Sequence, residues 1–219
     1  MRLVRLTWTI GGIGLILSAV IGLLRYLRLD VGPAIAVSLD VVFAAAVLLF
    51  AIGLSKEASV VARRPLGVVA LTILAVWPLA LRLVHPFLPD MSSAFDAGLD
   101  AYREAETILT AVSFANLLVM LSAGLIGAIQ IARARNVPTP WRWAPLWAVI
   151  ASLAAGVLPQ LLFVAGTAGT QYFTEVAIIS SVLDLLPRTL GLGILALVLA
   201  SQHHAGKKKP ARVHTLPAT

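Results

Sequence analysis

The chain has 219 residues, of which 59% are hydrophobic and only 12% are charged, whereas about a quarter of the residues of a soluble domain are charged. This composition lies far outside the soluble range and predicts that the lipid bilayer surrounds the chain. The absence of cysteine excludes disulfides, thiolate metal sites and cysteine nucleophiles. The net charge of +7 comes from bases between apolar segments, which follow membrane orientation, so we expect no nucleic-acid partner.

Six apolar segments are each long enough, at about 20 residues, to cross a hydrocarbon core about 30 Å thick. They cover residues 6–24, 34–54, 66–86, 107–131, 143–166 and 177–200. No soluble domain fits between them, so the sequence predicts an all-α bundle of six transmembrane helices that forms a single domain over residues 1–200. Residues 201–219 are polar and without periodicity, and we expect a disordered, basic cytoplasmic tail.

The first segment follows Arg2 and Arg5, as the apolar part of a signal peptide would. Its apolar run is long and no Ala-x-Ala cleavage site follows, so we interpret it as the first transmembrane helix. Small residues recur at four-residue spacing in the first and fifth segments, at Gly14, Ser18 and Gly22 and at Ala148, Ser152 and Gly156. Such faces either pack helices together within the chain or form a homo-oligomer.

Lysine and arginine are distributed unevenly among the loops, and the cytoplasmic loops of membrane proteins carry the excess of these residues. Twelve of the seventeen lie on one side: Arg2, Arg5, Lys56, Arg63, Arg64, Arg133, Arg135, Arg142, Lys207, Lys208, Lys209 and Arg212. Arg25, Arg28 and Arg103 lie on the other side, and seven of the ten acidic residues face the same way. We therefore expect both termini in the cytoplasm and the protein in a bacterial cytoplasmic membrane.

The long outer loop, residues 85–106, has the pattern of a short amphipathic helix. Ser92 or Ser93 is the expected N-cap, and an apolar stripe follows at i, i+4 and i+7: Phe95, Leu99 and Tyr102. The opposite face carries three like charges: Asp96, Asp100 and Glu104. These acids form either a solvated face or a lid that attracts cations.

Six polar side chains lie inside the apolar segments, all in the outer halves: Asp40, Arg82, Asn116, Gln160, Asp184 and Arg188. At 1.5 Å per residue, Arg82 is about 7 Å deep and Arg188 is near the midplane. A charged side chain at the bilayer centre costs about 2.5 to 3.5 kcal/mol, so these groups should face the bundle interior and find partners. Matching depths predict an ion pair between Asp40 and Arg82, and i, i+4 spacing allows one between Asp184 and Arg188.

Three prolines lie within five residues of these polar groups: Pro78, Pro159 and Pro187. Each removes a backbone hydrogen bond and frees the carbonyl four residues earlier, so the third, fifth and sixth helices are predicted to be kinked. Broken helices beside charges are typical of binding sites inside membranes. The alternative is that ion pairs and kinks only hold the bundle together.

His85 stands at the outer end of the third segment, beside Pro86. It is either an interfacial side chain or a proton relay that works with Asp40 or Asp184. A lone histidine does not make a haem or zinc site, and we expect no metal or cofactor.

The sequence contains no phosphate-binding loop, zinc-protease motif or nucleophile elbow, and no span contains a lysine. The polar cluster favours binding or translocation of a small solute or ion, by the chain alone or as the membrane subunit of a larger transporter. The alternative is a non-catalytic accessory subunit whose charges fix helix packing. An intramembrane enzyme that uses Asp40, Asp184 or His85 as acid or base is the less favoured third hypothesis. The expected partners are the lipid bilayer, a small solute or ion, and a protein subunit or a second copy of the chain.

Overall fold

A computed structural model describes residues 2–26, 33–134, 137, 141–164, 182–183 and 185–205. Helices and turns make up this part of the chain, which contains no strand. The α-helices are α1 (Arg2–Tyr26), α2 (Pro33–Ile52), α3 (Pro65–Val84), α4 (Met91–Ala97), α5 (Leu99–Ala134), α6 (Ala144–Val164) and α8 (Leu192–Ala205). Two 3-10 helices, η1 (His85–Phe87) and η2 (Trp141–Trp143), and a π-helical segment, η3 (Leu186–Gly191), complete the described elements. The predicted all-helical class is thereby confirmed.

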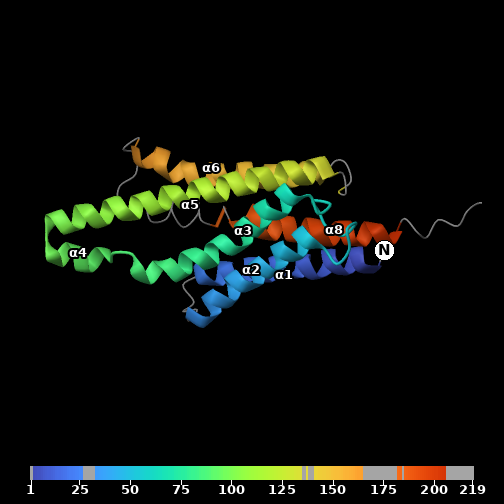
Figure 1. Cartoon of the computed structure of the whole chain (residues 1–219), viewed down its shortest axis with the longest axis horizontal. Helices are drawn as coiled ribbons and strands as arrows, with labels where there is room; N and C mark the ends of the chain where they lie inside the picture. Colours follow the sequence, from blue (N-terminus) through green and yellow to red (C-terminus); the bar gives the residue numbers. More distant parts are fainter. Residues whose placement is uncertain are drawn as a thin grey trace, which may run out of the picture.

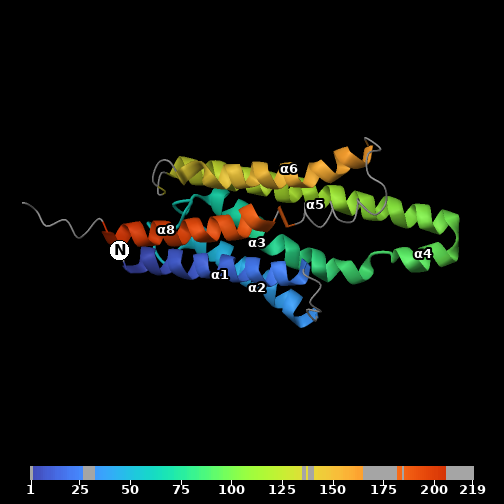
Figure 2. The same cartoon turned by 180° about the vertical axis from the view of Figure 1, so that it is seen from behind.

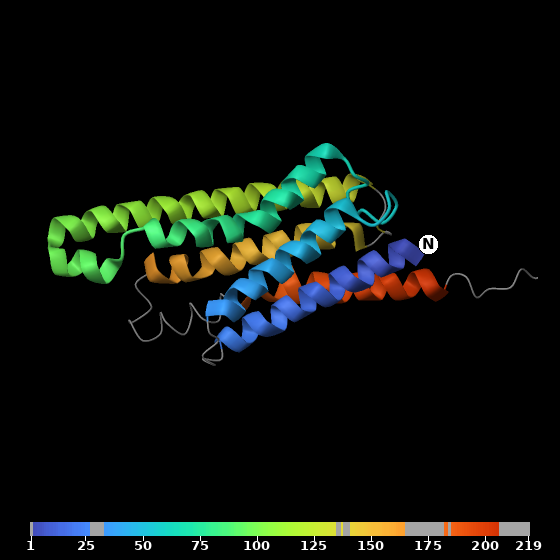
Figure 3. The same ribbon diagram turned by 60° about the horizontal axis from the view of Figure 1, so that its bottom comes forward.

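The long helices lie along one common axis, and successive long helices run in opposite directions (Figures 1 and 2). α1 packs against α2 and α8, α3 lies between α2 and α5, and α6 packs on α5 and η3. Figure 3 shows the start of α1, the end of α8 and the connection from α2 to α3 at one end of the bundle. We call this end, which carries Arg2 and residues 53–64, the inner end, and the opposite one the outer end.

Among the described residues, three helical stretches are long and apolar enough to cross a membrane: Leu3–Leu24, Pro65–Ala97 and Leu99–Ala134. Two shorter apolar helices cover Val37–Ile52 and Thr189–Ser201. These stretches suggest a membrane-embedded protein. α8 continues to Ala205, five residues beyond the predicted end of the last segment, while residues 206–219 of the expected tail lie outside the described part.

The outer loop differs from its prediction, because two helices replace the single one expected. Asp90, and neither serine, is the N-cap of α4, and its carboxylate accepts a hydrogen bond from the backbone N–H of Ser93 at 3.1 Å. The chain then turns at Gly98, where φ is +118°, a value that L side chains rarely adopt. α5 therefore starts at Leu99, eight residues before the predicted span, and the hairpin of α4 and α5 projects beyond the outer end (Figure 1).

The small-residue face of α1 packs inside the bundle. A side-chain carbon added to Gly14 would lie 3.0 Å from Cβ of Ala46 on α2, and Ser18 is only 1% exposed. The closest approach to α8 uses a different glycine pair, since a carbon added to Gly193 would lie 3.0 Å from the carbonyl oxygen of Gly12. The first of the two expected roles, packing of helices within the chain, therefore accounts for this face.

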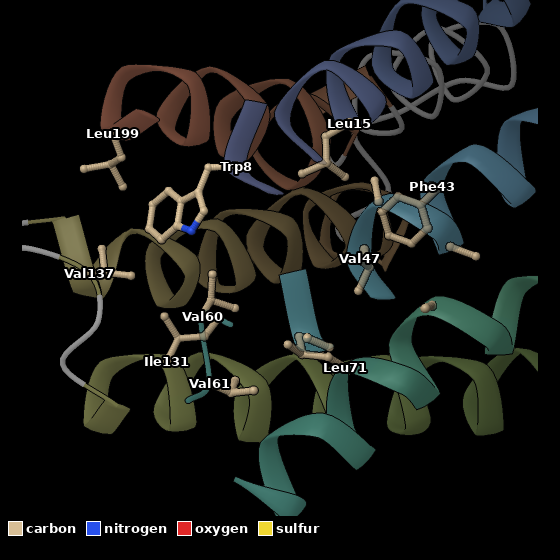
Figure 4. Packing of buried hydrophobic residues seen from close by; sticks show 14 of the residues in the cluster. Trp8, Leu15, Phe43, Val47, Val60, Val61, Leu71, Ile131, Val137 and Leu199 are labelled. Atoms are coloured by element: carbon tan, nitrogen blue, oxygen red, sulfur yellow. The ribbon is translucent and has the colours of Figure 1, made fainter. Parts of the chain in front are cut away.

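The inner end is closed by the ordered connection between α2 and α3. Ser59 donates to the carbonyl of Ala51 at 2.6 Å, and the indole N–H of Trp8 in α1 donates to the carbonyl of Ala58 at 3.1 Å. Val60 and Val61 of this connection belong to the main apolar core, which Figure 4 shows between the helices. The connection is thus packed into the bundle rather than lying over it.

Candidate functional site

An interhelical ion pair lies in the outer half of the bundle. Nη2 of Arg82, in α3, is 2.5 Å from Oδ2 of Asp40, in α2, and Nε of the arginine donates to the same oxygen at 2.8 Å. The side chain of Arg82 is 36% exposed and that of Asp40 is 19% exposed in the chain by itself. The guanidinium can therefore interact both with its carboxylate and with a group that approaches from outside the helix pair.

A second polar contact joins α3 to its other neighbour. The indole N–H of Trp77 donates to Oδ1 of Asn116, in α5, at 2.9 Å. Trp77 precedes Pro78, which lies inside α3 without ending the helix. Because Trp77 and Arg82 are five residues apart, they point about 140° apart around the helix. Polar groups on two faces of α3 therefore connect it to α2 and to α5.

Three of the six predicted cluster residues are described with their side chains, and they form these two separate contacts. Asp40 and Arg82 make the predicted pair, whereas Asn116 binds Trp77, which is not among the predicted cluster residues. For Gln160 and Arg188 the structure describes the backbone, in α6 and η3, but not the side chains, and Asp184 lies outside the described residues. The predicted pair of Asp184 and Arg188 stays a prediction.

The last helix contains a π-helical segment beside Pro187, where the sequence predicts a kink. Residues Leu186–Gly191 form the π-helical segment η3, and the hydroxyl of Thr189 donates to the carbonyl of Leu185 at 2.6 Å. Pro187 cannot supply an N–H to the carbonyl of Leu183, four residues earlier, and the hydroxyl of Thr189 binds a different carbonyl, that of Leu185. π-helical segments are rare and are frequent at functional sites.

His85 is exposed at the outer end of α3, in η1, where its carbonyl oxygen accepts the N–H of Leu88. In the described part of the chain, no hydrogen bond or ion pair joins its imidazole to Asp40, so the relay hypothesis stays a prediction. Among the described residues, no group of three or more histidines and carboxylates is placed to hold a metal ion. The described polar contacts between the long helices of the outer half therefore include one ion pair and one indole–amide hydrogen bond, and the last helix adds a π-helical segment.

Apolar helices around a few interhelical polar contacts suggest, as a class, a membrane-embedded helical protein. No protein-family model, no curated protein and no solved structure matches this chain. Any more specific function has to be inferred from the residues of the chain itself.

Proposed function

We propose that the chain is a six-span protein of the bacterial cytoplasmic membrane with both termini in the cytoplasm. α1, α2, α3, α5, α6 and α8 alternate in direction, which is compatible with six crossings (Figure 1). The described bases of the proposed cytoplasmic side lie toward the inner end: Arg2, Arg5, Lys56, Arg63, Arg64, Arg133 and Arg142. At the outer end, residues 91–106 of the hairpin of α4 and α5 contain a single base, Arg103, which agrees with the positive-inside rule.

The proposed function is the binding or translocation of a small solute or ion at the outer half of the bundle, by the chain alone or as the membrane subunit of a larger transporter. The partly exposed pair of Arg82 and Asp40 carries this proposal. A guanidinium inside an apolar helix is costly unless it faces a protein-lined or wet cavity, and such residues commonly mark solute pathways. The π-helical segment η3, which packs against α1, α6 and α8, offers irregular backbone of the kind found around membrane binding sites.

Native mass spectrometry of the protein, extracted in mild detergent from its own host, tests this function. The wild-type spectrum should contain a retained small molecule, and Arg82→Gln should lose it while remaining folded. Arg103→Gln is the matched control, because Arg103 is an exposed residue of the outer hairpin. A wild-type protein without any retained molecule, or equal retention in Arg82→Gln, would contradict the proposal.

The second candidate function is a non-catalytic accessory subunit, and the two polar contacts of α3 favour it. Arg82 and Trp77 each hold α3 to a different neighbour, which is what a purely structural role needs. In this case the native spectrum contains a stoichiometric protein partner and no small molecule. The intramembrane enzyme remains the least supported alternative, since Oδ2 of Asp40 is already bound by two nitrogen atoms of Arg82.

A further inference from the structure

A cavity of about 130 Å³ lies in the inner half of the bundle, away from the ion pair. All of the long helices and the connection between α2 and α3 contribute side chains to its wall. Its lining includes Trp8 of α1, Phe50 of α2, Val60 of the connection, Leu71 of α3 and Ala196 of α8. Figure 4 shows Trp8, Val60 and Leu71 around this region of the core.

The wall of the cavity is apolar throughout. Trp8 and Trp141 are the lining residues with a polar side-chain atom, and the indole N–H of Trp8 donates to the carbonyl of Ala58 at 3.1 Å. The ring of Phe50 meets Trp8 edge-on, with centroids 6.5 Å apart, and adds a further apolar surface. A water molecule needs two to four polar partners, so this wall does not favour water.

The size and chemistry of the cavity determine what fits. A polar or charged ligand would lose its hydration without gaining hydrogen bonds, which is strongly unfavourable. An empty cavity is also unfavourable, because its lining atoms lose dispersion contacts. Cavities of about 150 Å³ lined by Leu, Ile and Phe stay dry and bind benzene, so a hydrocarbon group of about six carbons suits a cavity of this size.

We propose that this inner cavity is a binding site for a hydrocarbon group, either part of the acyl chain of a membrane lipid or a free apolar compound. The lining extends from the inner end to Phe43 in the middle of the bundle, one turn from Asp40, but it includes neither Asp40 nor Arg82. Because its chemistry is opposite to that of the ion pair, the proposal does not depend on the function proposed above. Dispersion contacts with Leu71, Phe50 and the indole face of Trp8 supply the recognition.

Trp8 provides the measurement, because its side chain is only 2% exposed and lines the cavity. Bromine atoms quench tryptophan fluorescence on close approach, and the Trp8 signal is obtained as the difference between the wild type and Trp8→Phe. The protein is reconstituted in vesicles of dioleoylphosphatidylcholine, with either mid-chain dibrominated lipid or added bromobenzene. We expect at least a twofold loss of the Trp8 signal from one or both probes.

Filling the cavity with a larger side chain distinguishes quenching of Trp8 by a molecule in the cavity from quenching by the surrounding lipid. Ala196→Leu places three more carbons in the cavity and should restore most of the Trp8 signal, whereas Ala45→Leu, the same change at an exposed position of α2, should not. Val60→Leu, which adds one carbon from the connection, serves if Ala196→Leu does not fold. Quenching by the brominated lipid assigns an acyl chain, and quenching by bromobenzene alone assigns a free compound. An unquenched Trp8, or equal quenching in the blocked variants, would overturn the proposal.

Discussion

Arg82 of α3 directs two of its nitrogen atoms at one carboxylate oxygen of Asp40, in α2, at 2.5 and 2.8 Å. Both residues come from apolar helices, and their side chains are partly shielded in the chain alone. Removing one partner leaves a charge without its counter-ion, whereas removing both leaves none. The stability of the protein should therefore depend on the two residues jointly.

The first prediction is a coupling of about 1 kcal/mol between Asp40→Asn and Arg82→Gln, with the double variant more stable than the sum of the single effects implies. The reversed pair, Asp40→Arg with Arg82→Asp, should recover part of the stability that either single charge reversal loses. Equilibrium unfolding in mixed micelles measures these free energies. Strict additivity of the single variants would show that the pair contributes nothing to the fold.

This pair was predictable because depth in a regular helix follows from counting 1.5 Å per residue, and a buried charge has few acceptable partners. Trp77 and Asn116 were harder to match, since neutral groups at similar depth accept many partners. The one available signal was that Trp77, beside Pro78, lies at a depth similar to that of Asn116. The side chains of Gln160 and Arg188, and all of Asp184, lie outside the described residues, so most of the cluster stays a prediction.

The loops were the least predictable part of the chain. The i, i+4, i+7 spacing of Phe95, Leu99 and Tyr102 favours one continuous helix, but Gly98 turns the chain between them. Phe95 and Tyr102 still meet, edge-on with ring centroids 6.1 Å apart, across the turn between α4 and α5. Hydropathy patterns record which side chains are apolar, and they do not record a single backbone angle that reverses the chain direction.

The second prediction concerns Arg63, whose guanidinium closes the end of α2. Its Nε donates to the carbonyl of Ile52 at 2.9 Å and its Nη2 to that of Gly53 at 3.2 Å. Arg63→Lys loses this two-point contact and should lower the free energy of unfolding by about 1 kcal/mol. Arg64→Lys is the matched control, because Arg64 forms its hydrogen bond to Val61 through the backbone.

Equilibrium unfolding in mixed micelles also measures this effect, and hydrogen exchange locates it. The amide of Val60, which donates to the carbonyl of Phe50, should exchange faster in Arg63→Lys than in Arg64→Lys. Equal stability and equal exchange in the two variants would mean that the guanidinium of Arg63 does not help to hold the connection.

The third prediction is a pH dependence of the outer hairpin that comes from Asp90. Hydrogen bonds from the hydroxyl of Ser92 and the backbone N–H of Ser93 lower the pKa of the Asp90 carboxyl below its usual value of 3.8. A lowered pKa in the folded state means that this stabilisation is fully present above about pH 3.8 and is lost as the pH falls through the folded pKa. The N terminus of α4 should therefore fray only in acid.

Amide exchange of Ser93 and Ala94 measures this fraying as the pH is lowered, after correction for the intrinsic exchange rate. Asp90→Asn keeps an N-cap acceptor without a titrating group, so its protection should not vary across this range. Asp90→Ala should lose protection at all pH values. The same acid-induced loss in Asp90→Asn would assign the effect to another group of the hairpin.

The fourth prediction tests the contact between α1 and α8 at Gly193. A carbon added there would lie 2.8 Å from Cγ1 of Ile16 and 3.0 Å from the carbonyl oxygen of Gly12, so Gly193→Ala must push the helices apart. This overpacking should cost about 1 to 3 kcal/mol. A carbon added to Gly191 meets only the carbonyl oxygen of Leu186, at 3.5 Å, so Gly191→Ala should be neutral or slightly stabilising.

The two variants carry the same substitution only two residues apart, at the end of η3 and the start of α8, so the difference between their thermal unfolding midpoints isolates the close approach. A displaced α8 also carries Ala196 away from the inner cavity, because this residue lies less than one turn beyond Gly193. Gly193→Ala should therefore both unfold at a lower temperature than Gly191→Ala and change the quenching of Trp8 by brominated probes. Equal midpoints would mean that α1 and α8 yield to the added carbon, and that the glycine pair does not fix their distance.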